Sequence, residues 1–142
     1  MMTAENNLTR FLEAQLHDYE HALTEVRLGR KTGHWMWYIF PQIIGLGSSE
    51  NARFFGIRNK LEAMEYLNHP VLGPRLIEIS TALLSLKGKE ATSIFGGIDS
   101  LKLQSSMTLF SLIDKTSPVF EQVLDKFFGG VKDRNTIQII NG

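Results

Sequence analysis

Residues 8–26, LTRFLEAQLHDYEHALTEV, decide the fold of this chain. Their large apolar side chains recur at steps of three and four residues, which places them on one face of a helix. Asn7 is predicted to cap the start of this helix and Gly29 to end it, because glycine tolerates the left-handed backbone found there. The inward residues predicted by this pattern are Leu8, Phe11, Leu12, Leu16, Tyr19, Leu23 and Val26.

The rest of the chain continues in the same helical manner, with polar caps and glycine or proline at the boundaries. Ser48 or Ser49, Asp99, Ser117 and Asp133 are the predicted caps, and no alternating stretch flanked by hairpin turns competes with the helices. We therefore predict an all-α fold: a single globular domain over residues 1–142, with an ordered core over about residues 8–140. It should contain about seven or eight helices, several of them short. Apart from residues 8–26, the helices are expected near residues 52–55, 59–67, 70–86, 89–95, 100–113, 118–128 and 133–140.

A second segment, residues 34–42 (HWMWYIFPQ), is apolar all round and must be buried on most sides. Periodicity does not decide between a short helix and a strand, and Pro41 is expected to end the element. One interpretation is a core segment whose aromatic rings fill space. The other is the wall of a pocket, in which Trp35 and Trp37 stack on a ligand while His34 and Gln42 form hydrogen bonds with it.

A third segment, residues 102–108 (KLQSSMT), sets an ammonium group beside hydroxyl groups on one helical face. Lys102 lies three or four residues before Ser105 and Ser106, a spacing that matches no standard serine–lysine catalytic pair. A structural interpretation is equally simple, because hydroxyls inside helices often bond back to the preceding turn. Both interpretations of this segment stay open at the level of sequence.

Composition excludes several classes of function. Lys plus Arg and Asp plus Glu are both 15, so the chain lacks the basic excess of a nucleic-acid binder. The longest apolar run, residues 35–41, is far shorter than the roughly 20 residues of a membrane helix, and the N-terminus does not resemble a signal peptide. The chain has no cysteine, and only His17 and His21 have ligand-like spacing, which does not complete a metal site. We expect a cytoplasmic protein without a metal or other cofactor.

Several motifs together resemble a known family. They are residues 34–42 followed by GLGS at 45–48, HPVLGPRL at 69–76, IFG at 94–96 and KLQSSMTLF at 102–110. Over about residues 8–140 the sequence is similar to domain-of-unknown-function family 1810, whose members are bacterial, stand-alone and mainly helical. Such sequences are sometimes called calpastatin, but calpastatin is disordered and this chain is patterned for a packed core. One departure is Ile98, where the family usually has a polar residue or proline.

The resemblance implies no established activity, substrate or catalytic residue, so the function has to be argued from the residues. Our first hypothesis is a domain or enzyme that binds a small polar, nucleotide-like ligand between residues 34–42 and 102–108. His34 is the best candidate for a general base, because its ordinary pKa lies near neutrality. The alternative is a non-catalytic module that binds a protein partner or forms a homo-oligomer. The expected ligand contacts are His34, Trp35, Trp37, Gln42, Lys102, Ser105 and Ser106.

Overall fold

A computed structural model describes residues 4–142, and its first helix is longer than the sequence pattern predicts. Helix α1 (Ala4–Leu28) begins before Asn7, so Asn7 lies inside the helix and does not cap it. The predicted end is confirmed, because Gly29 has a φ of 76° in the left-handed region.

All the regular elements in the described residues are helices, which confirms the all-α prediction. There is one helix more than the largest number predicted, because residues 36–39 of the apolar segment form a single helical turn. The only strand-like pairing described is an isolated parallel bridge between Ile43 and Ile57. After α1 the helices are α2 (Met36–Ile39), α3 (Glu50–Phe54), α4 (Lys60–Asn68), α5 (Leu72–Leu84), α6 (Ala91–Phe95), α7 (Gly97–Ser111), α8 (Val119–Phe128) and α9 (Arg134–Asn141).

Short polar side chains at the N-cap position cap three of these helices by accepting a free backbone N–H in the first turn. Ser49 accepts from the N–H of Ala52 at 3.1 Å and so starts α3. Asn59 accepts from Glu62 at 2.9 Å at the start of α4. The predicted cap at Asp133, at the start of α9, is confirmed. The predicted cap Ser117 lies one residue earlier, before the N-cap Pro118 of α8, and its hydroxyl accepts from the N–H of Val119 at 3.2 Å.

The start of α7 differs from the prediction. The helix begins at Gly97, and its N-cap is Gly96, whose φ of 82° suits a residue without a Cβ atom. Asp99 therefore lies in the first turn instead of capping the helix, and its carboxylate is free to form ion pairs. Ile98, the residue that departs from the family pattern, is 75% exposed.

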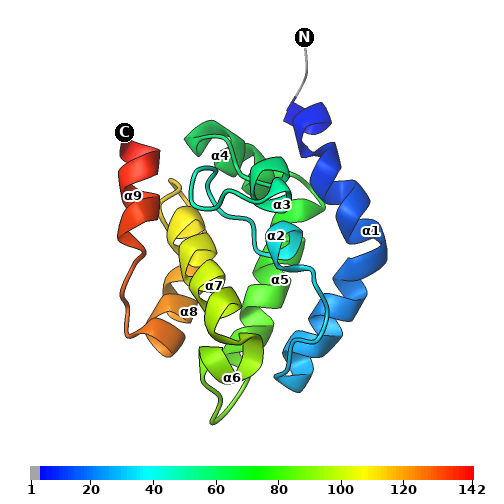
Figure 1. Ribbon diagram of the computed structural model, residues 1–142, viewed down its shortest axis with the longest axis vertical. Coiled ribbons are helices and arrows are strands. Elements are labelled where there is room, and N and C mark those ends of the chain that lie inside the picture. Colours follow the sequence, from blue (N-terminus) through cyan, green and yellow to red (C-terminus); the bar gives the residue numbers. More distant parts are fainter. Residues whose placement is uncertain (1–3) are drawn as a thin grey trace.

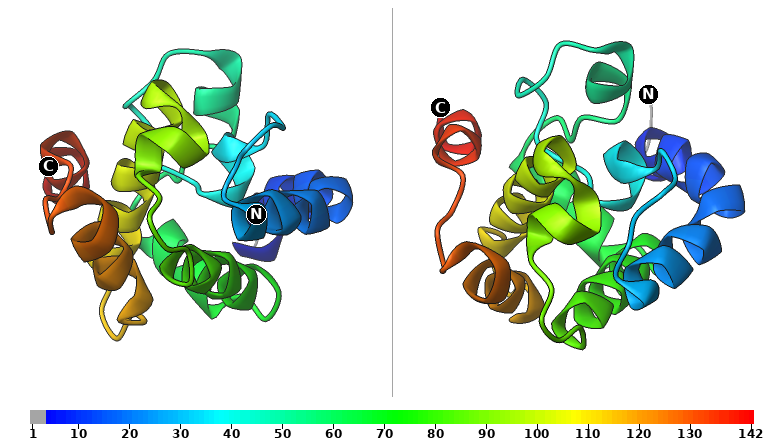
Figure 2. Two further views of the ribbon diagram at one scale, coloured as in Figure 1. Left: turned by 90° about the horizontal axis from the view of Figure 1, so that it is seen from below. Right: turned by 60° about the horizontal axis from the view of Figure 1, so that its bottom comes forward.

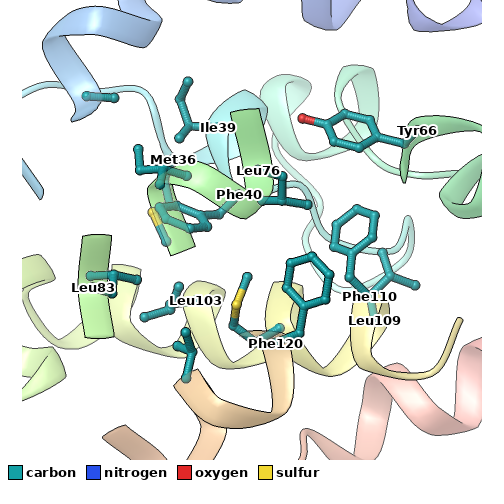
Figure 3. Close-up of a cluster of buried hydrophobic side chains, with 14 of the residues drawn as sticks. Met36, Ile39, Phe40, Tyr66, Leu76, Leu83, Leu103, Leu109, Phe110 and Phe120 are labelled. Atoms are coloured by element: carbon teal, nitrogen blue, oxygen red, sulfur yellow. The ribbon is translucent and has the colours of Figure 1, made fainter. Parts of the chain in front are cut away.

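Helix α2 lies between α1 and α7 and fills the space between them (Figure 1). Helix α5 packs against α1, α4 and α8, while α7 packs against α6, α8 and α9. Figure 3 shows how side chains from these helices meet in one core. The labelled core residues are Met36, Ile39, Phe40, Tyr66, Leu76, Leu83, Leu103, Leu109, Phe110 and Phe120.

One predicted core residue is not in the core: Leu16 is 72% exposed. Its neighbour Gln15 takes the inward position, only 2% exposed. The Gln15 amide donates hydrogen bonds to the backbone oxygen of Tyr38 at 2.8 Å and to the phenol oxygen of Tyr66 at 3.0 Å. A buried polar side chain is tolerated when its hydrogen bonds are satisfied, and here it connects α1 to α2 and α4.

A loop that carries α3 closes at its base through backbone hydrogen bonds. The N–H of Ile44 donates to the oxygen of Ile57 at 2.8 Å, and the N–H of Ile57 donates to the oxygen of Gln42 at 2.8 Å. A Cβ atom on Gly56 would come within 2.9 Å of the Ala52 oxygen, so this approach requires glycine. The loop extends away from the other helices, as Figure 2 shows.

Arg10 of α1 contacts both α4 and the loop. It forms a buried ion pair with the carboxylate of Glu62 in α4 at 2.6 Å, and it donates a hydrogen bond to the backbone oxygen of Gly56 in the loop at 3.0 Å. Only 9% of the Arg10 side chain and 6% of the Glu62 side chain are exposed. Removing one partner of such a pair leaves a buried charge uncompensated, which is strongly destabilising.

The chain has three tyrosines, and the pKa of each phenol is raised above its ordinary value. Burial is the main cause for all three. At Tyr19 and Tyr38, hydrogen bonds to the carboxylates of Glu78 and Asp18 raise the pKa further, because an ionised phenol would lose that bond and repel the carboxylate.

We expect no tyrosine to ionise near its ordinary pKa of about 10 while the protein is folded. A raised folded pKa contributes stability below about pH 10, and this contribution is lost as the pH rises towards the folded value. Absorbance of phenolate at 295 nm should therefore stay flat through pH 10 and then rise together with unfolding. A titration step near pH 10 with unchanged circular dichroism would contradict the described packing.

Candidate functional site

An open cleft of about 640 Å³ lies between the loop that carries α3 and the first turns of α7 and α9. Its size is in the range typical of small-molecule sites. The side chains that line it are both apolar and polar, and they come from segments far apart in the sequence. The lining residues are Trp37, Gln42, Ile43, Leu46, Gly47, Ser48, Ser49, Asn51, Ala52, Phe55, Gly56, Ile98, Leu101, Lys102, Ser105, Asp133 and Asn135.

Lys102 is the cation of the cleft. Its ammonium nitrogen lies 4.6 Å from the centre of the Trp37 ring, close enough for a cation–π interaction. The same nitrogen donates a hydrogen bond to Oδ1 of Asp99 at 3.2 Å. These contacts come from α2 and from the preceding turn of α7, so they hold the ammonium group beside the indole.

Asp99 has a second and closer cation. Its Oδ2 atom lies 2.7 Å from Nζ of Lys31, a side chain that is only 8% exposed. Burial alone would raise the pKa of Asp99, but the hydrogen bonds and charges of Lys31 and Lys102 lower it below its ordinary value. Asp99 is therefore ionised at neutral pH, and its three-charge group with Lys31 and Lys102 has a surplus of one positive charge.

On the other side of Lys102, Ser105 joins α7 to the start of α9. Its hydroxyl lies 3.1 Å from the backbone oxygen of Leu101 and 3.2 Å from Oδ2 of Asp133. Asp133 Oδ2 also accepts from the N–H of Thr136 at 3.0 Å, as the cap of α9. The N–H of Asp133 in turn donates to the Thr108 hydroxyl at 2.9 Å. This network fixes α9 against α7 and brings Asn135 to the cleft.

Several polar groups of the cleft make no hydrogen bond with any residue that the structure describes. They are the indole N–H of Trp37 and the side chains of Gln42, Ser48, Asn51 and Asn135. Polar groups with protein partners mostly serve the fold, whereas convergent groups without such partners can serve a ligand. The residues that line the cleft therefore include one ammonium group, three side-chain amides, a serine hydroxyl and an indole, together with apolar side chains such as Ile43 and Leu46.

The two segments predicted to form a site do meet, but only part of each reaches the cleft. Trp37, Gln42, Lys102 and Ser105 line it, whereas His34, Trp35 and Ser106 do not. Trp35 and Trp37 are two residues apart around one helical turn, so their side chains point to different sides. Trp35 is 2% exposed and packs against Phe95, so the structure places it in the core and not on the cleft.

The other two residues lie elsewhere. His34 is exposed and is not among the residues that line the cleft, so the geometry gives no support to a general base at this position. Ser106 is completely buried on the inner face of α7. Conversely, sequence reasoning missed Asn51 and Asn135, because single asparagines in polar segments carry no distinguishing pattern.

Removal of the Ser105 hydroxyl and removal of the Ser106 hydroxyl should change the free energy of unfolding in opposite directions. The Ser106 hydroxyl is buried without a hydrogen-bond partner among the described residues, and such a group costs about 1–3 kcal/mol. Ser106→Ala should therefore raise the free energy of unfolding by about 1 kcal/mol. Ser105→Ala should lower it by about 1 kcal/mol, because Asp133 loses a donor. Urea denaturation of the matched pair measures both, and equal changes would contradict this assignment.

A carboxylate in α1 holds the segment that leads into α2 and Trp37. Glu25 Oε1 accepts hydrogen bonds from the N–H groups of Thr32 and Gly33, at 2.6 and 2.8 Å, and from the indole N–H of Trp35 at 3.0 Å. Partial burial alone would raise the pKa of Glu25, but these hydrogen bonds lower it.

We expect the free energy of unfolding to fall as the pH drops below the ordinary glutamate pKa of about 4.3 and towards the folded value. A lowered folded pKa contributes stability above that range and loses it on protonation. Glu25→Gln should be less stable than the wild type at pH 7, and the difference should shrink at acid pH. Urea denaturation at several pH values measures it, with the exposed Glu20→Gln as the matched control. A difference independent of pH would refute the role of the Glu25 charge.

Within the described residues, no group of three or more histidine and carboxylate side chains is arranged to hold a metal ion. None of the helices described combines the length and the apolar character needed to cross a membrane. The geometry thus defines an all-helical domain with an open, mixed polar and apolar cleft.

The family model described as protein of unknown function (DUF1810) matches residues 5–140, so the chain belongs to that family. Its fold is similar to the crystal structure of the conserved hypothetical protein Rv1873 from Mycobacterium tuberculosis. The two sequences are 44% identical, the match covers 96% of this chain and 97% of that one, and the TM-score is 0.94. A comparison with curated proteins gives no match. These relationships fix the family and the fold.

Proposed function

We propose that this protein binds a small polar ligand in the cleft between the α3 loop and helices α7 and α9. The observation that carries the proposal is the convergence of polar groups without protein partners on one cleft beside Lys102. In the core, by contrast, Gln15 is fully engaged with neighbouring groups.

The ligand contacts in this proposal are a subset of those predicted from the sequence, with additions from the loop and α9. Trp37 supplies a ring face and an N–H donor, and Lys102 supplies a charge. Gln42, Asn51 and Asn135 supply amides that both donate and accept. Ser105 acts indirectly, by holding Asp133 and the start of α9 in place.

A second candidate function is a protein-binding module, and one observation favours it. Ile98 and Leu101, at the edge of the cleft, are 75% and 63% exposed. Neighbouring exposed apolar side chains are a common feature of interaction surfaces. The cleft behind them, with its unpartnered amides and its cation, favours a small polar ligand over a flat apolar partner.

The chain contains two tryptophans, one buried and one that lines the cleft, and this makes the proposal testable by ¹⁵N NMR. The indole N–H of Trp35 is buried and bonded to Glu25, so it serves as an internal reference. Trp37 lines the cleft, and its indole N–H makes no hydrogen bond with the described residues. We expect compounds from a library of polar metabolites to shift the Trp37 indole signal while the Trp35 signal stays in place.

Trp37→Phe removes one indole signal and so assigns the pair. Lys102→Met should weaken binding of any hit that carries negative charge, while Lys87→Met, at an exposed lysine outside the cleft, should not. If no library compound moves the Trp37 signal of the folded protein, the proposed function is wrong. The protein-binding candidate would then be the one to pursue.

A further inference from the structure

We infer that the ligand is a nucleoside monophosphate, that is, a heterocyclic base on a sugar with a single phosphate group. This inference rests on the proposed function and deepens it by naming the ligand class. It follows from three features of the cleft: the surplus charge at Lys102, the nearby carboxylate of Asp133, and the side-chain amides that line the same cleft as Trp37.

The surplus charge comes from the unequal pairing of Asp99. Lys31 lies 2.7 Å from this carboxylate and is almost fully buried. It therefore cannot reach a ligand, and its charge neutralises that of Asp99. Lys102 lies farther away, at 3.2 Å, and its side chain is 22% exposed in the cleft. One ammonium group is thus left to attract one anionic group, and no second cation lines the cleft among the described residues.

A second carboxylate near Lys102 limits how much negative charge fits. Asp133 lines the cleft at the start of α9 and is bonded to Ser105, which lies one helical turn after Lys102 on α7. Its Oδ2 atom accepts three hydrogen bonds, from Ser105 and from the N–H and hydroxyl of Thr136. Oδ1 makes none with the described residues, so it can accept an N–H donor of the ligand but repels a second phosphate.

The remaining groups suit a planar ring with hydrogen-bonding edges. Gln42, Asn51 and Asn135 carry amides, which pair with the donor and acceptor edges of nucleobases. Trp37 offers an aromatic surface of the kind on which bases stack. A free sugar phosphate would leave these amides and the ring unused. A nucleoside would leave Lys102 unused.

The test uses AMP, GMP and CMP, with ribose 5-phosphate, the three nucleosides and the three triphosphates as comparisons. Affinities are measured by calorimetry and by the Trp37 indole signal. We expect at least one monophosphate to bind about tenfold or more tightly than its nucleoside, since a charge-assisted hydrogen bond is worth at least that factor. It should also bind more tightly than its triphosphate, whose extra charge Asp133 repels, and than ribose 5-phosphate, which has no base for the amides. Equal affinity for the nucleoside, or tighter binding of the triphosphate or ribose 5-phosphate, would overturn the inference.

Two variants separate the charge argument from general damage to the fold. Lys102→Met should weaken monophosphate binding about tenfold or more. Asp99→Asn should strengthen it about threefold, because Lys102 loses its competing partner. The matched controls, Lys87→Met and Asp114→Asn, lie outside the cleft and should change nothing. Stronger binding in Asp99→Asn would support the charge argument, because a merely damaged site cannot gain affinity. Weaker binding would refute it.

The failure of this inference can be told apart from failure of the proposed function. If a library compound of another class shifts the Trp37 signal and none of the nucleotides does, the cleft is a ligand site and the named class is wrong. If neither the nucleotides nor the library shifts it, both proposals fall.

Discussion

The hydrogen bonds accepted by the Glu25 carboxylate are the constraint on which the rest of the structure depends. They gather two backbone N–H groups and the Trp35 indole around one oxygen, directly after α1 ends. Trp35 held inward and the bond from Gln15 to the Tyr38 oxygen together orient the single turn of α2. In this orientation Met36, Ile39 and Phe40 lie in the core and Trp37 lines the cleft. A carboxylate in α1 thereby helps to place a cleft residue on α2.

Much of the fold could be predicted from the sequence because the helices signal their own ends. Ser49, Asn59, Asp133 and Gly29 act locally, through bonds or backbone angles within a few residues. The predictions of which side chains are buried failed where residues distant in the sequence decide the burial. Gln15 is buried because Tyr38 and Tyr66 meet it, and no periodicity reveals those partners.

The candidate site was predictable to about the level of its segments, and less well at the level of residues. The aromatic segment and the lysine–serine segment do meet, but a segment that is apolar all round does not show which of its rings faces inward. The asparagines of the cleft carried no signal, since Asn51 and Asn135 become neighbours of one space only through the fold. Asp99 resembled a helix cap, and its role beside Lys31 and Lys102 requires contacts across the molecule.

The two walls of the cleft differ in how well they tolerate substitutions. Helix α7 carries Leu103, Met107 and Phe110 into the core, so most substitutions along it disturb packing. The loop with α3 closes on itself at Ile43 and Ile57, and none of the residues of α3 is buried. Substitutions on α3 can therefore change this wall without unfolding the domain. We expect homologues to differ most at the exposed positions of α3, while the motif at residues 45–48 and the charged wall are kept.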